Sequence, residues 1–124
     1  MSPEPARLIR WNDVAREELT PMLGRRVITG DRMMLAQIYL EEGAAVQKHL
    51  HENEQLTYVL EGRLRFWFGD DENQVLDVGA GEVVQIPSMV AHRVLALERT
   101  FELDMFCPPR QDWLDGSDNY LREQ

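Results

Sequence analysis

The chain has 124 residues, 44% of them hydrophobic, which is enough for one compact core and too few for two. Its 13 basic and 22 acidic residues give a formal charge of −9 at neutral pH, so most of its surface would repel a nucleic acid backbone or an anionic membrane. We therefore predict a single domain over residues 1–124 that binds neither nucleic acid nor membrane.

The expected location of the protein is the cytoplasm. The chain opens without the basic and apolar regions of a signal peptide, and no apolar run is long enough to span a bilayer. Cys107 is the only cysteine, so no intrachain disulfide can form. We expect it to be a buried or inert thiol, because no histidine lies near it in sequence.

The first predicted element is a short helix within residues 12–19, which would begin on an Asn or Asp cap and end after one or two turns at Thr20-Pro21. From Arg26 onward, short β-like runs alternate with glycine-containing and acidic turns. The predicted strands are residues 26–29, 34–40, 46–50, 55–60, 64–68, 74–77, 83–86, 92–97 and 101–106. Many short strands at this spacing predict an antiparallel sandwich or barrel, with its core at about residues 26–106.

Alternation along the predicted strands indicates which residues face the interior. Leu64, Phe66 and Phe68 share one face of their strand and should point inward. Beyond Pro109 the chain is polar, and its apolar residues should pack as a short segment or against a partner; these are Trp113, Leu114, Tyr120 and Leu121.

The three histidines occur in two places. His49 and His51 are separated by one residue, a spacing at which two imidazoles on a strand point the same way. A hairpin would bring Gln55 beside them, and sheet pairing could bring His92 opposite the pair. Three imidazoles and an amide oxygen would hold one divalent ion and leave one or two positions open. Isolated histidines are also common at surfaces and in cores, so this pattern alone leaves both interpretations open.

The spacing around these residues resembles the two sequence motifs of the cupin superfamily, over residues from about 34 to 106. The defining residues are Gly43, His49, His51, Gln55 and Gly62 in the first motif, and Gly81, Pro87 and His92 in the second. The resemblance implies an all-β fold, the double-stranded β-helix or jelly-roll barrel, with a short N-terminal extension and a short C-terminal tail. The glycines would form tight turns, and Pro87 would end a strand.

Three positions depart from the commonest form of the motifs. Met89 stands where glycine is usual and Ala96 where asparagine is frequent, which concerns turn geometry rather than metal binding. Gln55 replaces the more common glutamate. A neutral fourth ligand would leave the ion its full charge and bind it less tightly. The alternative is that Gln55 only hydrogen-bonds a water on the ion.

A second group of candidate residues lies near the end of the predicted barrel. Alternation places Glu102, Asp104 and Phe106 on one face of a strand and Leu103 and Met105 on the other. If the first face is inward, Asp104 is a carboxyl beside a cation, where a general acid or base is useful. If the second face fills the core, Asp104 is solvated. Alternation alone does not decide between them.

The run from Asp104 to Arg110, Asp-Met-Phe-Cys-Pro-Pro-Arg, looks like the C-terminal segment of the small cupins linked to pectin and alginate degradation. In that family three histidines and a glutamine bind a metal, and 4,5-unsaturated uronates are converted towards their linear keto form. The resemblance implies His49, His51, Gln55 and His92 as metal ligands, Asp104 as the acid or base, Phe106 as a pocket wall and Arg110 as a clamp for the substrate carboxylate.

The leading hypothesis is therefore a metal-dependent isomerase or lyase acting on a small, anionic sugar acid. The alternatives are a non-haem metal dioxygenase and a cupin that binds a small molecule without converting it. The cofactor would be one divalent ion, with zinc, nickel, manganese and iron all open. The exposed strands and the apolar residues Leu8, Ile9 and Trp11 lead us to expect a homodimer.

Overall fold

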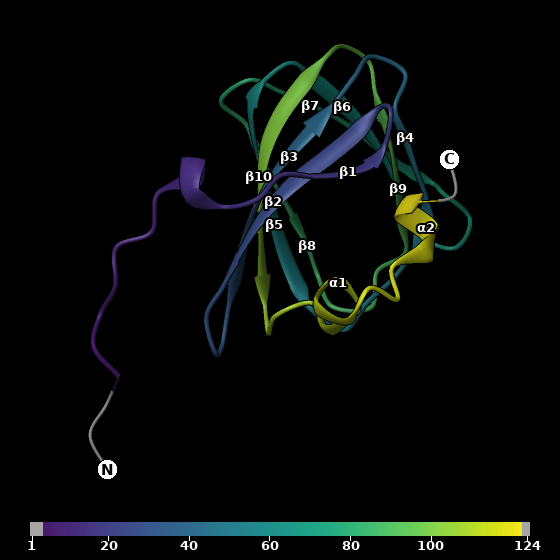
Figure 1. The fold of residues 1–124 in the computed structure, drawn as a ribbon. Helices are drawn as coiled ribbons and strands as arrows, with labels where there is room; N and C mark the ends of the chain where they lie inside the picture. Colours follow the sequence, from purple (N-terminus) through teal and green to yellow (C-terminus); the bar gives the residue numbers. More distant parts are fainter. Residues whose placement is uncertain (1–3, 123–124) are drawn as a thin grey trace.

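The structure, a computed structural model, describes residues 4–122 as two antiparallel β-sheets that curve around a shared interior (Figure 1). The larger sheet has six strands, in the order β1 (Glu17–Thr20), β2 (Leu23–Thr29), β3 (Met34–Leu40), β10 (Thr100–Cys107), β5 (Glu54–Glu61) and β8 (Val83–Ile86). The smaller sheet has the order β4 (Ala45–His49), β9 (His92–Ala96), β6 (Arg63–Phe68) and β7 (Gln74–Gly79). The prediction of an all-β fold is confirmed.

Strands from opposite ends of the chain are neighbours in both sheets. β10 lies between β3 and β5, and β9 lies between β4 and β6. This interleaving is the winding of a jelly roll, in which residues near 50 and residues near 100 share one interior. It is what brings the candidate site residues within reach of one another.

The interior is filled by the inward-facing residues of both sheets. Leu64, Phe66 and Phe68 alternate with more exposed neighbours and are all buried, as predicted. The same alternation makes Gln55, Thr57 and other inward residues of β5 part of the interior. Polar side chains in a barrel interior need hydrogen-bond partners there, and these partners build the site described below.

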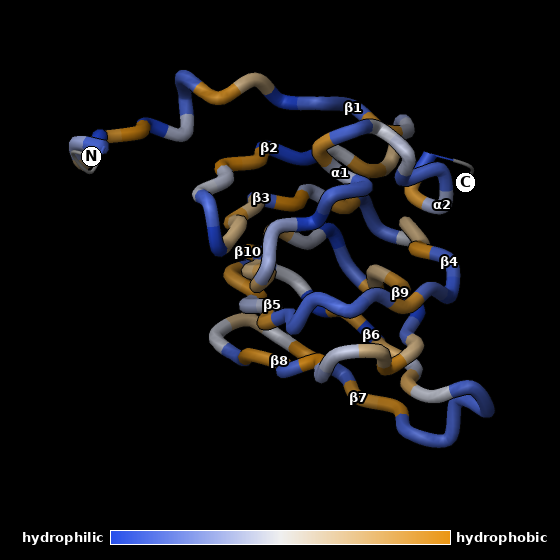
Figure 2. The backbone as a smooth tube through the Cα atoms, turned by 90° about the horizontal axis from the view of Figure 1, so that it is seen from below, coloured by the Kyte–Doolittle hydropathy of each residue, from blue (hydrophilic) through white to orange (hydrophobic). Residues whose placement is uncertain are grey.

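Each of the nine predicted strands overlaps an observed one, whereas the predicted N-terminal helix is wrong in its extent. Only a single 3-10 turn forms, η1 (Trp11–Asp13), and residues 17–20 are the strand β1. Glu17 pairs with Arg25 and Glu18 with Gly24 of β2. For residues 17–20, pairing with the edge of the sheet outweighs their weak helix propensity. Residues 4–16 run outside both sheets (Figures 1 and 2).

Two tight turns explain sequence features of the motifs. Gly62 has φ +95°, and a Cβ there would lie 2.3 Å from the carbonyl oxygen of Arg99. Met89, at the position usually held by glycine, has φ +66°, so the methionine adopts the left-handed conformation that glycine adopts more easily. Its backbone N–H donates to the carbonyl of His51 at 2.9 Å. The turn geometry of the motif is thus kept without glycine.

The C-terminal tail folds back onto its own barrel. It forms α1 (Gln111–Asp115) and α2 (Asn119–Arg122), and α2 contacts the edge strands β1 and β4 of the two sheets (Figures 1 and 2). Trp113 and Leu121 are buried, so of the two expectations for the tail, packing on its own chain is the observed one. The described helices are all too short to cross a membrane.

Candidate metal centre and barrel lumen

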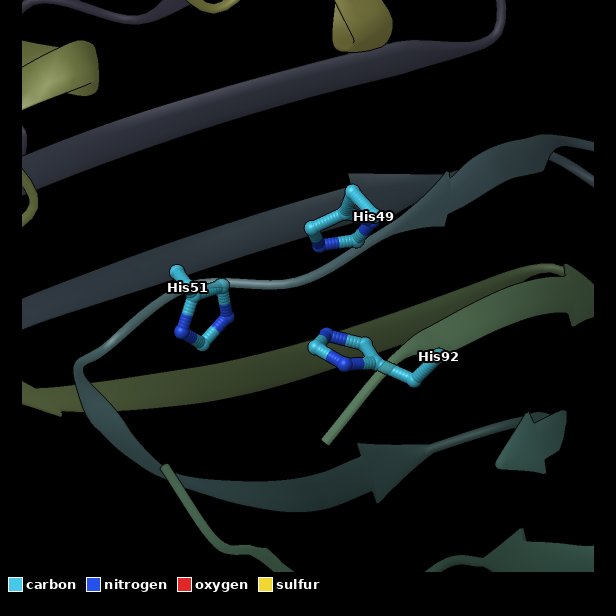
Figure 3. Close-up of side chains that lie close together, drawn as sticks. All are labelled: His49, His51 and His92. Atoms are coloured by element: carbon cyan, nitrogen blue, oxygen red, sulfur yellow. The ribbon is translucent and has the colours of Figure 1, made fainter. Parts of the chain in front are cut away.

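The three histidines converge in the barrel interior (Figure 3). His49 ends β4 and pairs directly with His92, the first residue of β9, while His51 lies in the loop that leads to β5. One ring nitrogen from each histidine lies within 4.8 Å of the others. The structure therefore brings together the histidine pair and the third histidine, as their spacing predicted.

Hydrogen bonds fix which nitrogen of each ring faces the centre. The Nδ1 atoms lie 2.8 Å from the carbonyl of Gln47 for His49, 3.0 Å from that of Asn53 for His51, and 2.9 Å from that of Val90 for His92. A carbonyl only accepts, so each Nδ1 carries the hydrogen and each Nε2 keeps its lone pair. Backbone partners of this kind orient histidine ligands in metal sites.

The environment keeps the rings neutral. Burial, with the neighbouring His92 as the next cause, lowers the pKa of His49 to about 3. Burial also lowers the pKa of His92 to about 4 and that of His51 below its ordinary value. Neutral imidazoles with free lone pairs are the form that binds a metal.

Gln55 completes the set of inward-facing candidate metal ligands. Its Oε1 lies 3.1 Å from His51 Nε2, and its Nε2 donates to Thr57 Oγ1 at 2.9 Å. Because His51 carries its hydrogen on Nδ1, its Nε2 and the Oε1 of Gln55 face each other as two acceptors. A cation between these two atoms would remove their repulsion. Three neutral nitrogens and one neutral oxygen fit a divalent ion of the zinc, nickel, manganese or iron type.

Thr57 connects this cluster to Asp104. Its hydroxyl donates to Asp104 Oδ1 at 2.6 Å and must then accept from the Gln55 amide. This requirement turns the amide so that its oxygen faces the histidines. Thr57 was not among the predicted site residues, although its position two residues after Gln55, on the same inward face, was a signal for it.

The structure places Asp104 inside the barrel, with 6% of its surface exposed. Burial raises its pKa to about 6, while the hydrogen bond from Thr57 and the charge of Arg110 act to lower it. Glu102, two residues earlier, is also buried, and burial together with the charge of Asp104 raises its pKa well above the ordinary value. The two carboxyls hydrogen-bond to each other, so Glu102 keeps its proton and Asp104 titrates close to neutrality.

Phe106 and Arg110 lie beside the cluster, and both are buried. The Phe106 ring lies 5.9 Å from that of His51, and the Arg110 guanidinium lies 5.1 Å from the centre of the Phe106 ring. Arg110 Nε donates to Asp112 Oδ1 at 3.0 Å, and its Nη2 donates to Asp112 Oδ2 at 2.8 Å and to the Tyr120 hydroxyl. Burial acts to lower the pKa of Arg110, but the hydrogen bonds and charge of Asp112 hold that pKa above its ordinary value.

The tail also covers the histidines. The Tyr120 ring stacks on His49 with 4.3 Å between ring centres, and Trp113 Nε1 donates to the Tyr120 hydroxyl at 3.2 Å. The lumen has a volume of about 50 Å³, and its lining includes His49 and His92 of the cluster and Trp113 and Tyr120 of the tail. From the sequence, Tyr120 and Trp113 were expected only to pack, and no pattern pointed to Asp112.

Cys107, in contrast, is exposed. It ends β10 on the face opposite Phe106, so of the expected buried or inert thiol the buried alternative is wrong. Alternation along the strand places it outside.

Comparisons with known proteins agree with this architecture. The family model described as the cupin domain matches residues 36–107. KdgF from Halomonas sp. has a TM-score of 0.74 at 23% identity, covering 82% of this chain and 94% of its own. An RmlC-like cupin from Shewanella frigidimarina has a TM-score of 0.78 at 22% identity, covering 88% of this chain and 96% of its own.

A Bacillus subtilis oxalate decarboxylase with Mn(II) centres has a TM-score of 0.71 at 22% identity, covering 86% of this chain and 33% of its own. No curated protein matches the chain. At such identities the solved structures show a shared fold, whereas the family model matches the sequence itself over more than half of its length. The chain belongs to the cupin domain family.

Proposed function

We propose that this protein is a metal-dependent enzyme that moves a proton on a small sugar acid of the 4,5-unsaturated uronate class, converting an enol into a ketone. The observation that carries the proposal is the continuous series of polar groups from His51 to Asp104: the Gln55 oxygen faces His51, the Gln55 amide donates to Thr57, and Thr57 donates to Asp104. It puts a carboxyl with a pKa of about 6 in the lumen that holds the histidine cluster.

His49, His51, Gln55 and His92 would hold the divalent ion, whose chemistry when bound is to polarise an oxygen of the substrate. The neutral donors leave the charge of such an ion undiminished. Among cupins of similar fold, the Bacillus subtilis oxalate decarboxylase has Mn(II) centres, which supports manganese as one candidate. Elemental analysis of protein purified without an affinity tag identifies the metal.

The remaining side chains bind the substrate and transfer the proton. Arg110 binds the substrate carboxylate, and Phe106 forms the wall beside it. Opening of the hemiacetal ring breaks the C1–O5 bond and leaves the oxygen on C5 as an enol hydroxyl. Asp104, held by Thr57, then donates a proton to C4 and takes the proton that leaves this hydroxyl, whose electrons form the ketone. The carboxyl returns to its starting state, and no co-reactant is consumed.

The test is the turnover of a 4,5-unsaturated uronate by Asp104→Asn. The amide keeps an oxygen that accepts from Thr57 but cannot exchange a proton, so we expect turnover to fall by at least about 100-fold while the metal stays bound. Unchanged turnover would remove Asp104 from the reaction. Turnover of the wild type under strict anaerobiosis separates this function from a dioxygenase, and recovery of the uronate unchanged would favour a binding protein.

We also propose that the protein is a homodimer. The outward face of the larger sheet carries an apolar groove of about 400 Å³ that includes Leu56 and Met105, and Leu8 in the N-terminal segment is 76% exposed. Apolar surface of this kind favours association of two copies. Light scattering measures the mass in solution, and a monomer would contradict the proposal.

A further inference from the structure

The anion-binding edge of Arg110 is already filled by the chain's own tail. Its Nε and Nη2 atoms donate to the two carboxylate oxygens of Asp112 at 3.0 and 2.8 Å. This two-point pairing of a guanidinium with a carboxylate is the geometry expected for a bound uronate. Arg110 is 2% exposed, so a second carboxylate cannot easily reach its guanidinium from solvent.

We infer that Asp112 occupies the position of the substrate carboxylate and thereby determines which ligands the site accepts. The inference deepens the proposed function and rests on Arg110 being its carboxylate clamp. Replacing one carboxylate by another on the same guanidinium gains little free energy. A ligand therefore binds only if a second polar group, in reach of the histidine cluster, supplies the rest of the affinity. The accepted class is hydroxy or oxo carboxylates, and simple carboxylates are excluded.

The surroundings of Asp112 show that binding requires the tail to move. Tyr120 accepts from the same Nη2 of Arg110 and stacks on His49. The lumen of about 50 Å³ is far smaller than the roughly 300 Å³ or more of common ligand pockets. Asp118, fully buried, stays bound to Arg25 at 2.6 Å. Gly116, with φ +79° and open space around it, lies between this anchor and α1.

An alternative role for Asp112, holding the Arg110 guanidinium in place for the substrate, predicts the opposite change in ligand affinity. If it only holds the guanidinium in place for the substrate, removing its charge must weaken ligand binding. If it competes with the substrate, removing its charge must strengthen binding. The sign of the change in dissociation constant therefore decides between them.

The experiment measures binding of D-galacturonate and of hexanoate to the metal-loaded full chain by calorimetry. We expect Asp112→Asn to lower the Kd of galacturonate by about 1.5- to 5-fold, the range of a partly exposed ion pair, and to bind hexanoate more tightly than the wild type does. Asp115→Asn is the matched control, since Asp115 lies in the same helix but accepts hydrogen bonds from Ser117 instead of Arg110. It should leave both constants unchanged.

Tyr120→Phe provides a second variant in case Asp112→Asn loosens the fold. It removes the hydroxyl from Arg110, keeps the ring on His49 and should also tighten galacturonate binding. A Kd that rises or stays the same in both variants, or no measurable binding by any of the proteins, overturns the inference. Galacturonate lacks the enol double bond, so these results do not depend on turnover, and a failure of the unsaturated uronate to react would count against the proposed function alone.

Discussion

Thr57 shows how one hydroxyl can set the geometry of two functional groups. It accepts from the amide of Gln55 and donates to the carboxyl of Asp104, two residues that lie far apart in sequence. The amide oxygen faces His51 only because the hydroxyl has no second hydrogen to offer. The residue therefore acts through its neighbours and positions both.

Thr57→Val keeps the shape of this side chain and removes both hydrogen bonds. The Gln55 amide then loses the acceptor that orients it, and we expect metal affinity to fall by about 10- to 100-fold, the usual effect of losing a partner behind a ligand. Titration of metal-free protein measures the affinity. Thr57→Ser keeps the hydroxyl and should bind metal like the wild type. Equal affinities for all three proteins would show that the hydroxyl does not orient the amide.

At the residue scale, the sequence allowed prediction of whatever depends on spacing along one strand. The positions of His49 and His51 follow from a separation of two residues, and the inward face of Phe66 follows from alternation. Thr57 and Asp112 could not be assigned in the same way, because their roles depend on atoms contributed by other segments. Met89 shows the reverse case, in which the chain keeps a turn without the residue type that marks it.

At the scale of elements, the order of the strands matters more than their boundaries. The nine predicted strands are all present, but β1 was missed because its four residues form a strand only by pairing with β2. Which strand lies beside which is not written in local patterns. The position of β10 between β3 and β5 was available only through the resemblance to a known family.

A buried ion pair holds the C-terminal tail on the barrel. Asp118 and Arg25 form an ion pair at 2.6 Å, with side-chain exposures of 0% and 1%, and Arg122 contacts the other carboxylate oxygen. Burial acts to raise the pKa of Asp118, but the hydrogen bonds from Arg122 and Arg25 outweigh it, and the pKa is lowered. The ionised carboxylate is therefore favoured in the folded state.

The sign of the pH dependence follows from that lowered pKa. The stabilisation by Asp118 is fully present above the ordinary pKa of an aspartate, about 4, and is lost as pH falls through the lower value of the folded state. We expect Asp118→Asn to lower the free energy of unfolding at pH 7 by about 3 kcal/mol, because the buried Arg25 loses its closer, fully buried carboxylate partner and keeps the half-exposed Glu17. Urea unfolding at a series of pH values measures both effects.

Below pH 4, the stability of Asp118→Asn should fall less steeply with pH than that of the wild type. Asp115→Asn, in the exposed part of the tail, removes the same charge without breaking the pair with Arg25 and serves as the control. If Asp118→Asn had the same stability as the wild type at pH 7, the ion pair would not anchor the tail.

At the scale of the whole molecule, the candidate metal centre joins the two sheets. His49 and His92 come from the smaller sheet, and Gln55 comes from the larger one. An ion bound by all of them would link the sheets and would bind only the folded chain. Folding stability should therefore depend on metal concentration.

Removal of the metal tests this dependence. We expect treatment with a chelator to lower the melting temperature, and an ion at about 100 times its Kd to restore about 2.7 kcal/mol of stability. His92→Ala should melt at the same temperature with and without metal. Calorimetry with the two proteins is the measurement, and a wild type insensitive to metal would contradict an ion shared between the sheets.

The contact of α2 with β1 and β4 has a consequence for solubility. These two strands are the outermost members of their sheets on that side, and their backbone groups would otherwise be open to pairing with foreign chains. Because α2 contacts both edge strands, it shields them from intermolecular β-sheet growth. A chain whose tail came loose would be at risk of aggregation even while its barrel remained folded.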